Sequence, residues 1–281
     1  MGVDFHHQDS AAAEEIRLLT ARLDRAADLH GEFAAAWQAY LDRRPHHLFH
    51  TTEADGSTAI RLRRVDPIPA ELSLILGEFL YEMRSALDNC LYAVAVITSG
   101  QNPPPAAEKL EWPIRATAQE WKNQRRRLDH LPGPIVEQLE AIQPYQAAVP
   151  SWNSLGILHD LARFDRHRAP RTLALYLVEV RLWAKPTDIT IIDPGSEGIV
   201  KDGETLVQYR LRDGATLSPE NFDLRVEFDV DVEDVHIGPG PRGSSGRLWG
   251  SLAQRLRSVH QAASGYCEGL LQSAAECAME D

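Results

Sequence analysis

The sequence predicts an α+β fold in which a bundle of long helices packs against a mostly antiparallel meander sheet. Three observations carry this prediction: long stretches with apolar residues at helical spacing, a separate block in which apolar and polar residues alternate, and Pro/Gly/Asp turns between the alternating stretches. Segregated runs of helices and strands favour α+β over an alternating parallel fold. We expect a single domain over residues 1–281. Its expected helical parts are 9–44, 70–169 and 246–279, and its expected sheet parts are 58–66 and 171–236.

The first half of the chain contains the longest helical patterns. Residues 9–41 form an amphipathic stripe that predicts a long helix, and Pro45 to Asp55 then indicates a loop. Alternation from Thr58 to Val65 predicts a strand. The strongest helix is expected from Ala70 to about Thr98, because Gly100 and the three prolines at 103–105 end its apolar stripe.

Shorter elements fill the second half. Helices are expected at 118–130, 134–142 and 151–168. Strands are expected at 173–184, 188–192, 205–212 and 223–236, the last with one apolar and one charged face. The segment 238–246, GPGPRGSSG, is predicted to be a flexible linker before the final helix.

Composition places the protein in a broad class. Globular fractions of hydrophobic (43%) and charged (25%) residues exclude wholesale disorder, and no apolar run approaches the roughly 18 residues of a membrane helix. The N-terminus lacks the pattern of a secretory signal, and three cysteines do not make a disulfide framework. We therefore expect a cytoplasmic protein without a membrane partner. The net charge of −12 argues against a general DNA-coating protein but allows a local basic patch.

The sequence offers little sign of metal or cofactor chemistry. His46, His47 and His50 form a short cluster of the residue type that binds zinc or copper, but no cysteine or carboxylate stands at a customary ligand spacing beside them. A solvated loop is the favoured interpretation. Neither a phosphate-binding loop nor a dinucleotide fingerprint is present. We expect no metal and no cofactor.

Arg84, Asp88 and Asn89 are candidate site residues within the strongest predicted helix. Arg84 and Asp88 are one turn apart, and an ion pair between them is the simplest structural interpretation.

A second candidate segment runs from 159 to 168. His159, Arg163 and His167 are spaced to share one polar face of its helix, whereas Asp165 falls on the apolar side. A buried carboxylate needs a partner, and either Arg168 or Arg84 could supply it.

Basic residues gather in two clusters, and Arg166 belongs to the second of them. The clusters are Lys122, Arg125, Arg126 and Arg127, and then Arg163, Arg166, Arg168 and Arg171. If their helices are adjacent, the clusters form an anion-binding surface for phosphate or nucleic acid. Otherwise they are solvated helix faces.

Four short segments resemble a widespread family of uncharacterised bacterial proteins. The matching pieces are Met83 to Asn89 (an Arg-Ser-Ala-Leu-Asp-His/Asn helix), Pro113-Ile114, Gln143-Pro144-Tyr145, and Asp165 to Arg168 (an Asp-Lys/Arg-His-Arg motif). They occur in the same order as in that family. This resemblance names no function.

The helix around Arg84 also resembles HEPN helical domains, whose Arg-x4-His motif acts on RNA phosphates without metal, commonly across a dimer interface. This resemblance implies that Arg84 contacts phosphate, with Asp165, His167 and Arg168 as the other catalytic candidates. Asn89 stands where the motif has histidine, and asparagine cannot carry a proton near pH 7. His167 or His159 could replace it only if the helices bring that histidine close to Arg84. The further candidate binding residues, taken from the two segments themselves, are Asp88, Asn89, His159, Arg163 and Arg166.

The first functional hypothesis is therefore a HEPN-like helical protein that binds RNA or acts on it as a metal-independent ribonuclease. Two alternatives stay open: a binding or scaffold protein in which these charges are structural, and a small-molecule enzyme of a bacterial pathway. A homodimer is expected only because two-fold symmetry is the commonest form of assembly.

Overall fold

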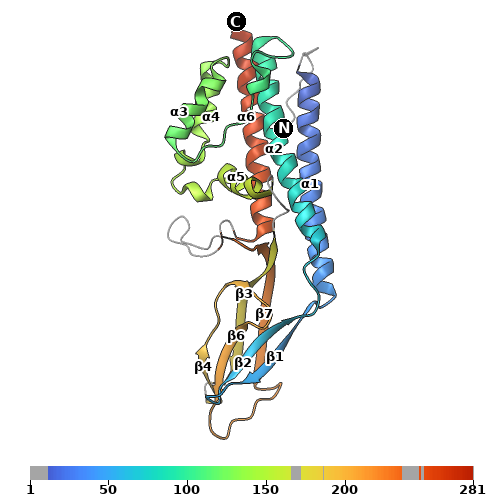
Figure 1. The fold of residues 1–281 in the computed structure, drawn as a ribbon, viewed down its shortest axis with the longest axis vertical. Helices are drawn as coiled ribbons and strands as arrows, with labels where there is room; N and C mark the ends of the chain where they lie inside the picture. Colours follow the sequence, from blue (N-terminus) through green and yellow to red (C-terminus); the bar gives the residue numbers. More distant parts are fainter. Residues whose placement is uncertain (1–11, 166–171, 186, 236–246, 248–249, 281) are drawn as a thin grey trace. The chain divides into compact units, whose positions relative to one another are not determined.

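The computed structural model describes residues 12–165, 172–185, 187–235, 247 and 250–280 (Figure 1). The chain divides into two compact units. A helical unit comprises Met1–Phe33, Leu74–Pro170 and Pro239–Asp281, and a sheet unit comprises Ala34–Ser73 and Arg171–Gly238. The predicted α+β class is confirmed. The single-domain organisation stays a prediction, because this division does not say whether either unit folds without the other.

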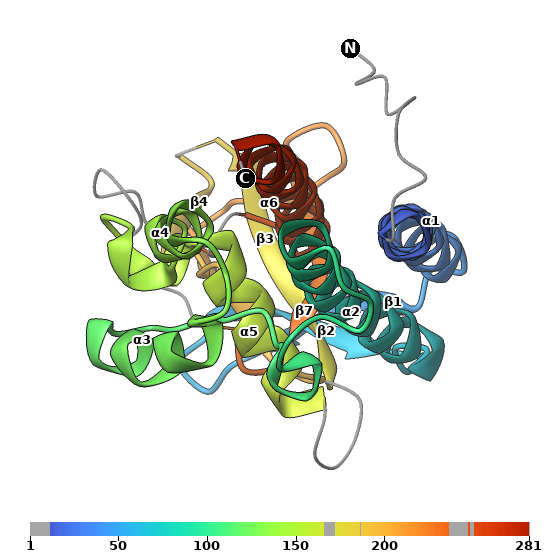
Figure 2. The same cartoon turned by 90° about the horizontal axis from the view of Figure 1, so that it is seen from above.

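Three long helices build the helical unit: α1 (Ala13–Asp42), α2 (Ala70–Ser99) and α6 (Leu252–Glu280), of which α1 and α2 extend into the sheet unit. Within the helical unit they run alongside one another (Figures 1 and 2). His30 and His260 hold α1 and α6 together, because each ring nitrogen Nε2 lies 2.9 Å from a main-chain carbonyl of the other helix. Apolar side chains such as Phe79 and Leu256 are fully buried, as the helical stripes predict.

Three short helices complete this unit: α3 (Ala118–Arg125), α4 (Gly133–Ala141) and α5 (Ser154–Asp165). Both α4 and α5 pack against α6. The helix predicted to reach residue 130 is shorter, because α3 gives way to a 3-10 turn at Arg126–Leu128. Among the described residues, no helix is long and apolar enough to cross a membrane.

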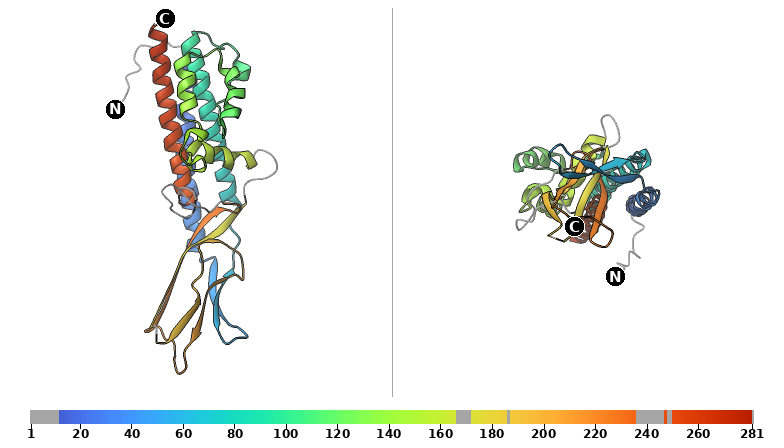
Figure 3. Two further views of the ribbon diagram at one scale, coloured as in Figure 1. Left: turned by 90° about the vertical axis from the view of Figure 1, so that its left-hand side faces the viewer. Right: turned by 90° about the horizontal axis from the view of Figure 1, so that it is seen from below.

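Seven antiparallel strands are described in the sheet unit, in two sheets (Figure 3). The strands are β1 (His46–Thr52), β2 (Thr58–Arg64), β3 (Leu173–Ala184), β4 (Ile189–Asp193), β5 (Gly198–Val200), β6 (Thr205–Leu211) and β7 (Phe222–Val232). One sheet has the order β1-β2-β6-β4 and the other β5-β3-β7. Leu62 and Leu206 from the first sheet share a core with Leu175 and Leu177 from the second.

Two sequence predictions about the sheet need correction. Residues 45–55 are not a loop, because His46–Thr52 pairs along its whole length with β2 across a turn that closes at Gly56. The three histidines of this segment are not apolar, so the sequence showed no clear alternation of apolar and polar residues. The strands also do not form a simple meander, since β3 lies between β5 and β7 while β6 lies between β2 and β4. The predicted linker at 238–246 lies outside the described residues.

Candidate functional site

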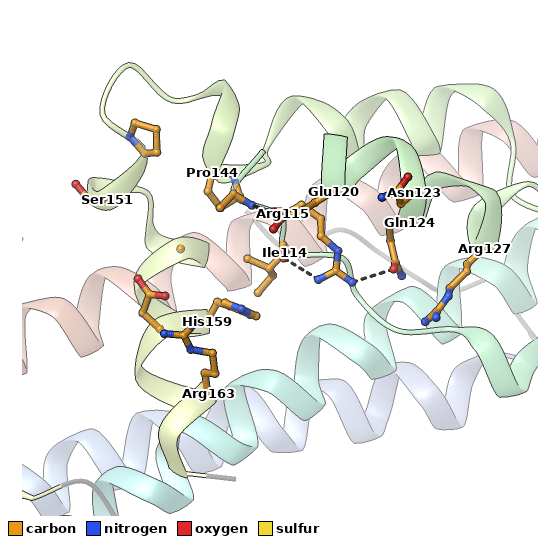
Figure 4. A pocket seen from close by; sticks show the side chains of 14 residues that line it. Ile114, Arg115, Glu120, Asn123, Gln124, Arg127, Pro144, Ser151, His159 and Arg163 are labelled. Carbon is orange, nitrogen blue, oxygen red and sulfur yellow. Dashed lines mark hydrogen bonds between the residues drawn. The ribbon is translucent and has the colours of Figure 1, made fainter. Parts of the chain in front are cut away.

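The helical unit contains a cavity of about 550 Å³ between α3 and α5 (Figure 4). The segment that leads into α3 and the turns before α5 complete its wall. The lining residues are Ile114, Arg115, Ala116, Glu120, Asn123, Gln124, Arg127, Pro144, Pro150, Ser151, Gly156, His159, Asp160 and Arg163. This volume lies within the range of small-ligand sites, about 300–1,000 Å³.

Side chains from other elements fix the segment 111–115, which forms one edge of the cavity. On α2, Asp88 Oδ1 accepts a hydrogen bond of 2.8 Å from the main-chain nitrogen of Trp112, and Arg84 Nη2 lies 3.5 Å from Glu111 Oε1. Gln143 is completely buried and makes three hydrogen bonds, two of them to this segment. It accepts from Arg115 N and donates to Pro113 O and Leu139 O. The path of this irregular segment therefore depends on side-chain hydrogen bonds.

Arg115 and Gln124 form a fixed polar pair on the cavity wall. Arg115 Nη1 donates to Ile114 O at 2.9 Å, and its Nη2 donates to Gln124 Oε1 at 2.8 Å. Because arginine can only donate, the atom of Gln124 that faces it must be the oxygen. The amide nitrogen Nε2 of Gln124 is then left as a donor, buried and without an acceptor in the described structure.

The start of α3 is set by a capping box between Thr117 and Glu120. Thr117 Oγ1 accepts from Glu120 N at 3.2 Å, and Glu120 Oε2 accepts from Thr117 N at 3.1 Å and from Ala116 N at 3.0 Å. This cap fixes where α3 begins and hence which of its side chains reach the cavity. It also occupies the carboxylate of Glu120 with main-chain donors.

The opposite wall is α5, and Gly156 lets this helix lie close to Pro144 and Pro150 in the turns that precede it. A Cβ at this position would lie 3.2 Å from the carbonyl oxygen of Pro150 and 3.5 Å from Pro144 Cβ. Asn153 Oδ1 caps the helix by accepting from the main-chain nitrogens of Leu155 and Gly156. From this helix His159 and Arg163 reach the cavity (Figure 4).

The electrostatics of the cavity converge on His159. Burial of the ring is the largest cause that lowers the pKa of His159 from its ordinary value, and the positive charge of Arg84 is the second. Asp160 opposes this effect, while Arg115 and Arg163 add to it. The pKa of His159 is thus lowered by three arginines from three different parts of the chain. The lowered pKa favours the neutral form of the His159 imidazole at neutral pH, close to the positive charges of these arginines.

The sequence-predicted residues of α2 fall on different sides of that helix. Arg84 is 6% exposed and lies toward Glu111, and its charge reaches His159. Asn89 Oδ1 instead accepts a 2.9 Å bond from Arg22 Nε on α1. Arg84 and Asn89 are therefore not placed together.

Asp165 ends α5, but its side chain lies outside the described structure. Arg166, His167 and Arg168 are also outside the described residues. Their predicted roles, and a partner for Asp165, stay predictions.

The two basic clusters come together in part. Arg127 from the first cluster and Arg163 from the second both line the cavity. The other members of the first cluster, Lys122, Arg125 and Arg126, are exposed and do not line it. Sequence reasoning missed Arg115, Gln124 and Gln143 as site residues. Each acts through a side-chain contact between different elements, with Arg115 and Gln124 separated by 9 positions in the sequence and Arg115 and Gln143 by 28, and helical or strand periodicity does not indicate such contacts.

The histidine cluster of β1 contacts aromatic rings. His46 packs edge-on against Phe228 with ring centroids 4.5 Å apart, and His50 lies 6.5 Å from the Phe222 ring. On a strand, His47 faces the side opposite to these two histidines. Within the described ranges, no group of three or more His, Cys, Asp or Glu side chains is arranged to hold a metal ion.

Comparisons with known proteins add no relative to this picture. No protein-family model, no curated protein and no solved structure matches the chain.

Proposed function

We propose that the helical unit binds RNA through phosphate groups that enter the cavity between α3 and α5. The observation that carries the anion-binding part is the convergence of Arg115, Arg127 and Arg163 on one cavity, with the charge of Arg84 behind His159. Guanidinium groups bind phosphate oxygens through two parallel hydrogen bonds, and a partly enclosed site strengthens them. The choice of RNA rests on the sequence resemblance of the Arg84 helix to HEPN domains.

The charge of the whole chain favours a local binding site over a broad one. At −12 the protein repels nucleic acid at long range. Binding then has to come from a few short contacts inside a concave site. A small phosphate-bearing molecule would use the same contacts. Measurement of the affinity for each ligand therefore distinguishes RNA from a small molecule.

A second candidate function is metal-independent cleavage of the bound strand, and His159 is the observation that favours it. A histidine that is neutral at pH 7 can accept the proton of a ribose 2′-hydroxyl while that oxygen attacks the adjacent phosphorus. The 5′-oxygen leaves with a proton from solvent, which yields a 2′,3′-cyclic phosphate and a 5′-hydroxyl end. Arginines beside the phosphorus would stabilise the charge that develops on its oxygens.

The binding proposal is tested by fluorescence anisotropy with a labelled single-stranded RNA and the full chain. Arg127→Ala and Arg163→Ala are each expected to weaken the Kd about tenfold, because each removes a charged hydrogen bond to phosphate. Each should also lower the slope of log Kd against log salt by about one.

The matched control is Arg126→Ala. Arg126 is exposed and adjacent to Arg127 in the chain, but it does not line the cavity. Its loss is expected to change the Kd less than twofold. Equal weakening by all three variants would mean that RNA contacts a diffuse basic surface, and it would contradict the proposal, as would the absence of RNA binding.

A further inference from the structure

Strand β4 leaves an open main-chain edge on the four-stranded sheet (Figure 1). It pairs with β6 in regular antiparallel register from Ile189 to Ile191, and Asp188 O accepts a hydrogen bond of 2.9 Å from Arg212 N. Antiparallel pairs alternate between bonded and non-bonded positions. The main-chain N–H and C=O groups of Ile189 and Ile191 therefore point away from β6, toward the open edge.

The other three sheet edges carry features that oppose pairing with a further strand. Strand β7 has a charged side chain at every second residue from Asp223 to Asp231, and the main-chain nitrogens of Val230 and Val232 each donate to the carboxylate of the preceding aspartate. Strand β1 contains three histidines, two of which contact aromatic rings of β7. Strand β5 is only three residues long. Charged, covered or very short edges are the usual protection against pairing between chains.

The open segment of β4 has none of this protection. Residues 189–192 read Ile-Thr-Ile-Ile, and the side chains of Ile191 and Ile192 are 42% and 44% exposed. Uncharged, β-branched edge segments of this kind pair readily with another strand. A bulge at Ile192 ends the regular pairing with β6, so the open edge accommodates one short strand.

We infer that β4 pairs with β4 of a second copy of this chain, antiparallel and centred on Thr190. In this register Ile189 of each copy exchanges main-chain hydrogen bonds with Ile191 of the other, and the two Thr190 side chains face each other. Asp188 lies opposite Ile192, so no two charges of the same sign are directly opposed. The four-stranded sheet then continues across a two-fold axis.

The chemistry of the edge favours a second copy over a different partner. A basic peptide, which the net charge of −12 would attract, would be expected to meet acidic side chains, and residues 189–192 have none. Two-fold pairing also uses the β4 edge of both copies, so it produces a closed dimer instead of a growing fibre. This inference does not depend on the proposed RNA function of the helical unit.

The test is sedimentation velocity of the full chain at about 1–200 µM in about 0.3 M salt, which screens the repulsion between two copies of net charge −12. One short strand pair buries less area than a standard interface, so we expect a reversible dimer with a Kd of about 10–100 µM. Thr190→Lys and Thr190→Glu are each expected to weaken this dimer about tenfold or more, because like charges then face each other. An equimolar mixture of the two variants is expected to restore it.

Thr52→Lys is the matched control, because Thr52 is exposed on the edge strand β1. It is expected to change the Kd less than about twofold. A thermal melt checks that each variant folds, since Arg210 lies opposite Thr190 on β6. Where Thr190→Lys melts early, Thr190→Glu alone is compared with the unmodified chain.

Three results would overturn the inference. The first is a chain that stays monomeric over the whole concentration range. The second is a dimer that both Thr190 variants leave intact, or that Thr52→Lys weakens equally, because the contact between copies then lies elsewhere. The third is a mixture of the Thr190 variants that stays as weak as either variant alone, which would contradict the register centred on Thr190.

Discussion

His159 is the residue whose surroundings say most about the cavity. The sequence predicted that His159 and Arg163 share a polar helix face, because they are one turn apart. The structure places both residues on the cavity wall. The sequence could not show that Arg84 and Arg115 act on the same ring. These residues are 75 and 44 positions away along the chain. Only the tertiary fold brings their charges together.

At this scale we predict how cleavage depends on His159. The sign follows from the lowered pKa: a general base must be neutral, so cleavage falls as pH drops through the lowered pKa of His159 and is constant above it. His159→Gln is expected to reduce EDTA-resistant cleavage of labelled RNA by about 100-fold or more. Binding, which relies on the arginines, should change far less. Denaturing gels at pH 5 to 8 provide the measurement.

The control for this prediction is His130→Gln. Burial also lowers the pKa of His130, but this residue does not line the cavity. Cleavage that persists in His159→Gln, or that is lost in both variants, would contradict the catalytic role of His159. Absence of cleavage in the unmodified protein would leave binding as the only proposed function.

Between α2 and α3, the chain has little regular structure, yet it forms one edge of the cavity. Side chains of Asp88 and Gln143 supply the hydrogen bonds that a helix or strand would have provided. Periodicity predicted the helices on either side, since their apolar stripes are long. It gave no indication of this segment's path, because that path depends on single contacts. Periodicity also did not predict the strand β5, because three residues are too few to show an alternating pattern.

We predict that Gln143→Leu destabilises the protein strongly. The substitution leaves Arg115 N and Pro113 O without their partner in a buried place. Each unpaired buried group costs roughly 1–3 kcal/mol, so the free energy of unfolding should fall by about 3 kcal/mol. Urea denaturation followed by circular dichroism measures this change.

Gln272→Leu provides the comparison, since Gln272 is exposed on α6 and bonds only to the exposed Glu276 among its described contacts. It is expected to change stability by less than about 0.5 kcal/mol. Should Gln143→Leu be as mild as this control, the segment 111–115 is held by something other than Gln143.

For the molecule as a whole, fold class and most element boundaries followed from the sequence, because helical and alternating patterns occupy separate stretches. Strand order did not follow, since β6 pairs with β2 across more than 140 residues of chain. A net charge of −12 likewise excluded a broad nucleic-acid surface but could not reveal an arginine-lined cavity. Total charge is a property of composition. The sign of the field inside a cavity depends on which few side chains meet there.

The most direct test of the central claim, that phosphate enters the cavity beside His159, is the pKa of His159 in the full chain with and without RNA. Nuclear magnetic resonance of protein labelled at its histidines gives this value, and His159→Gln identifies the signal. An anion next to the ring favours the charged imidazolium, so we predict that saturating RNA raises the pKa of His159 by about half a unit or more. RNA that binds at saturation while the titration of His159 stays unchanged would place the binding site elsewhere and contradict the account.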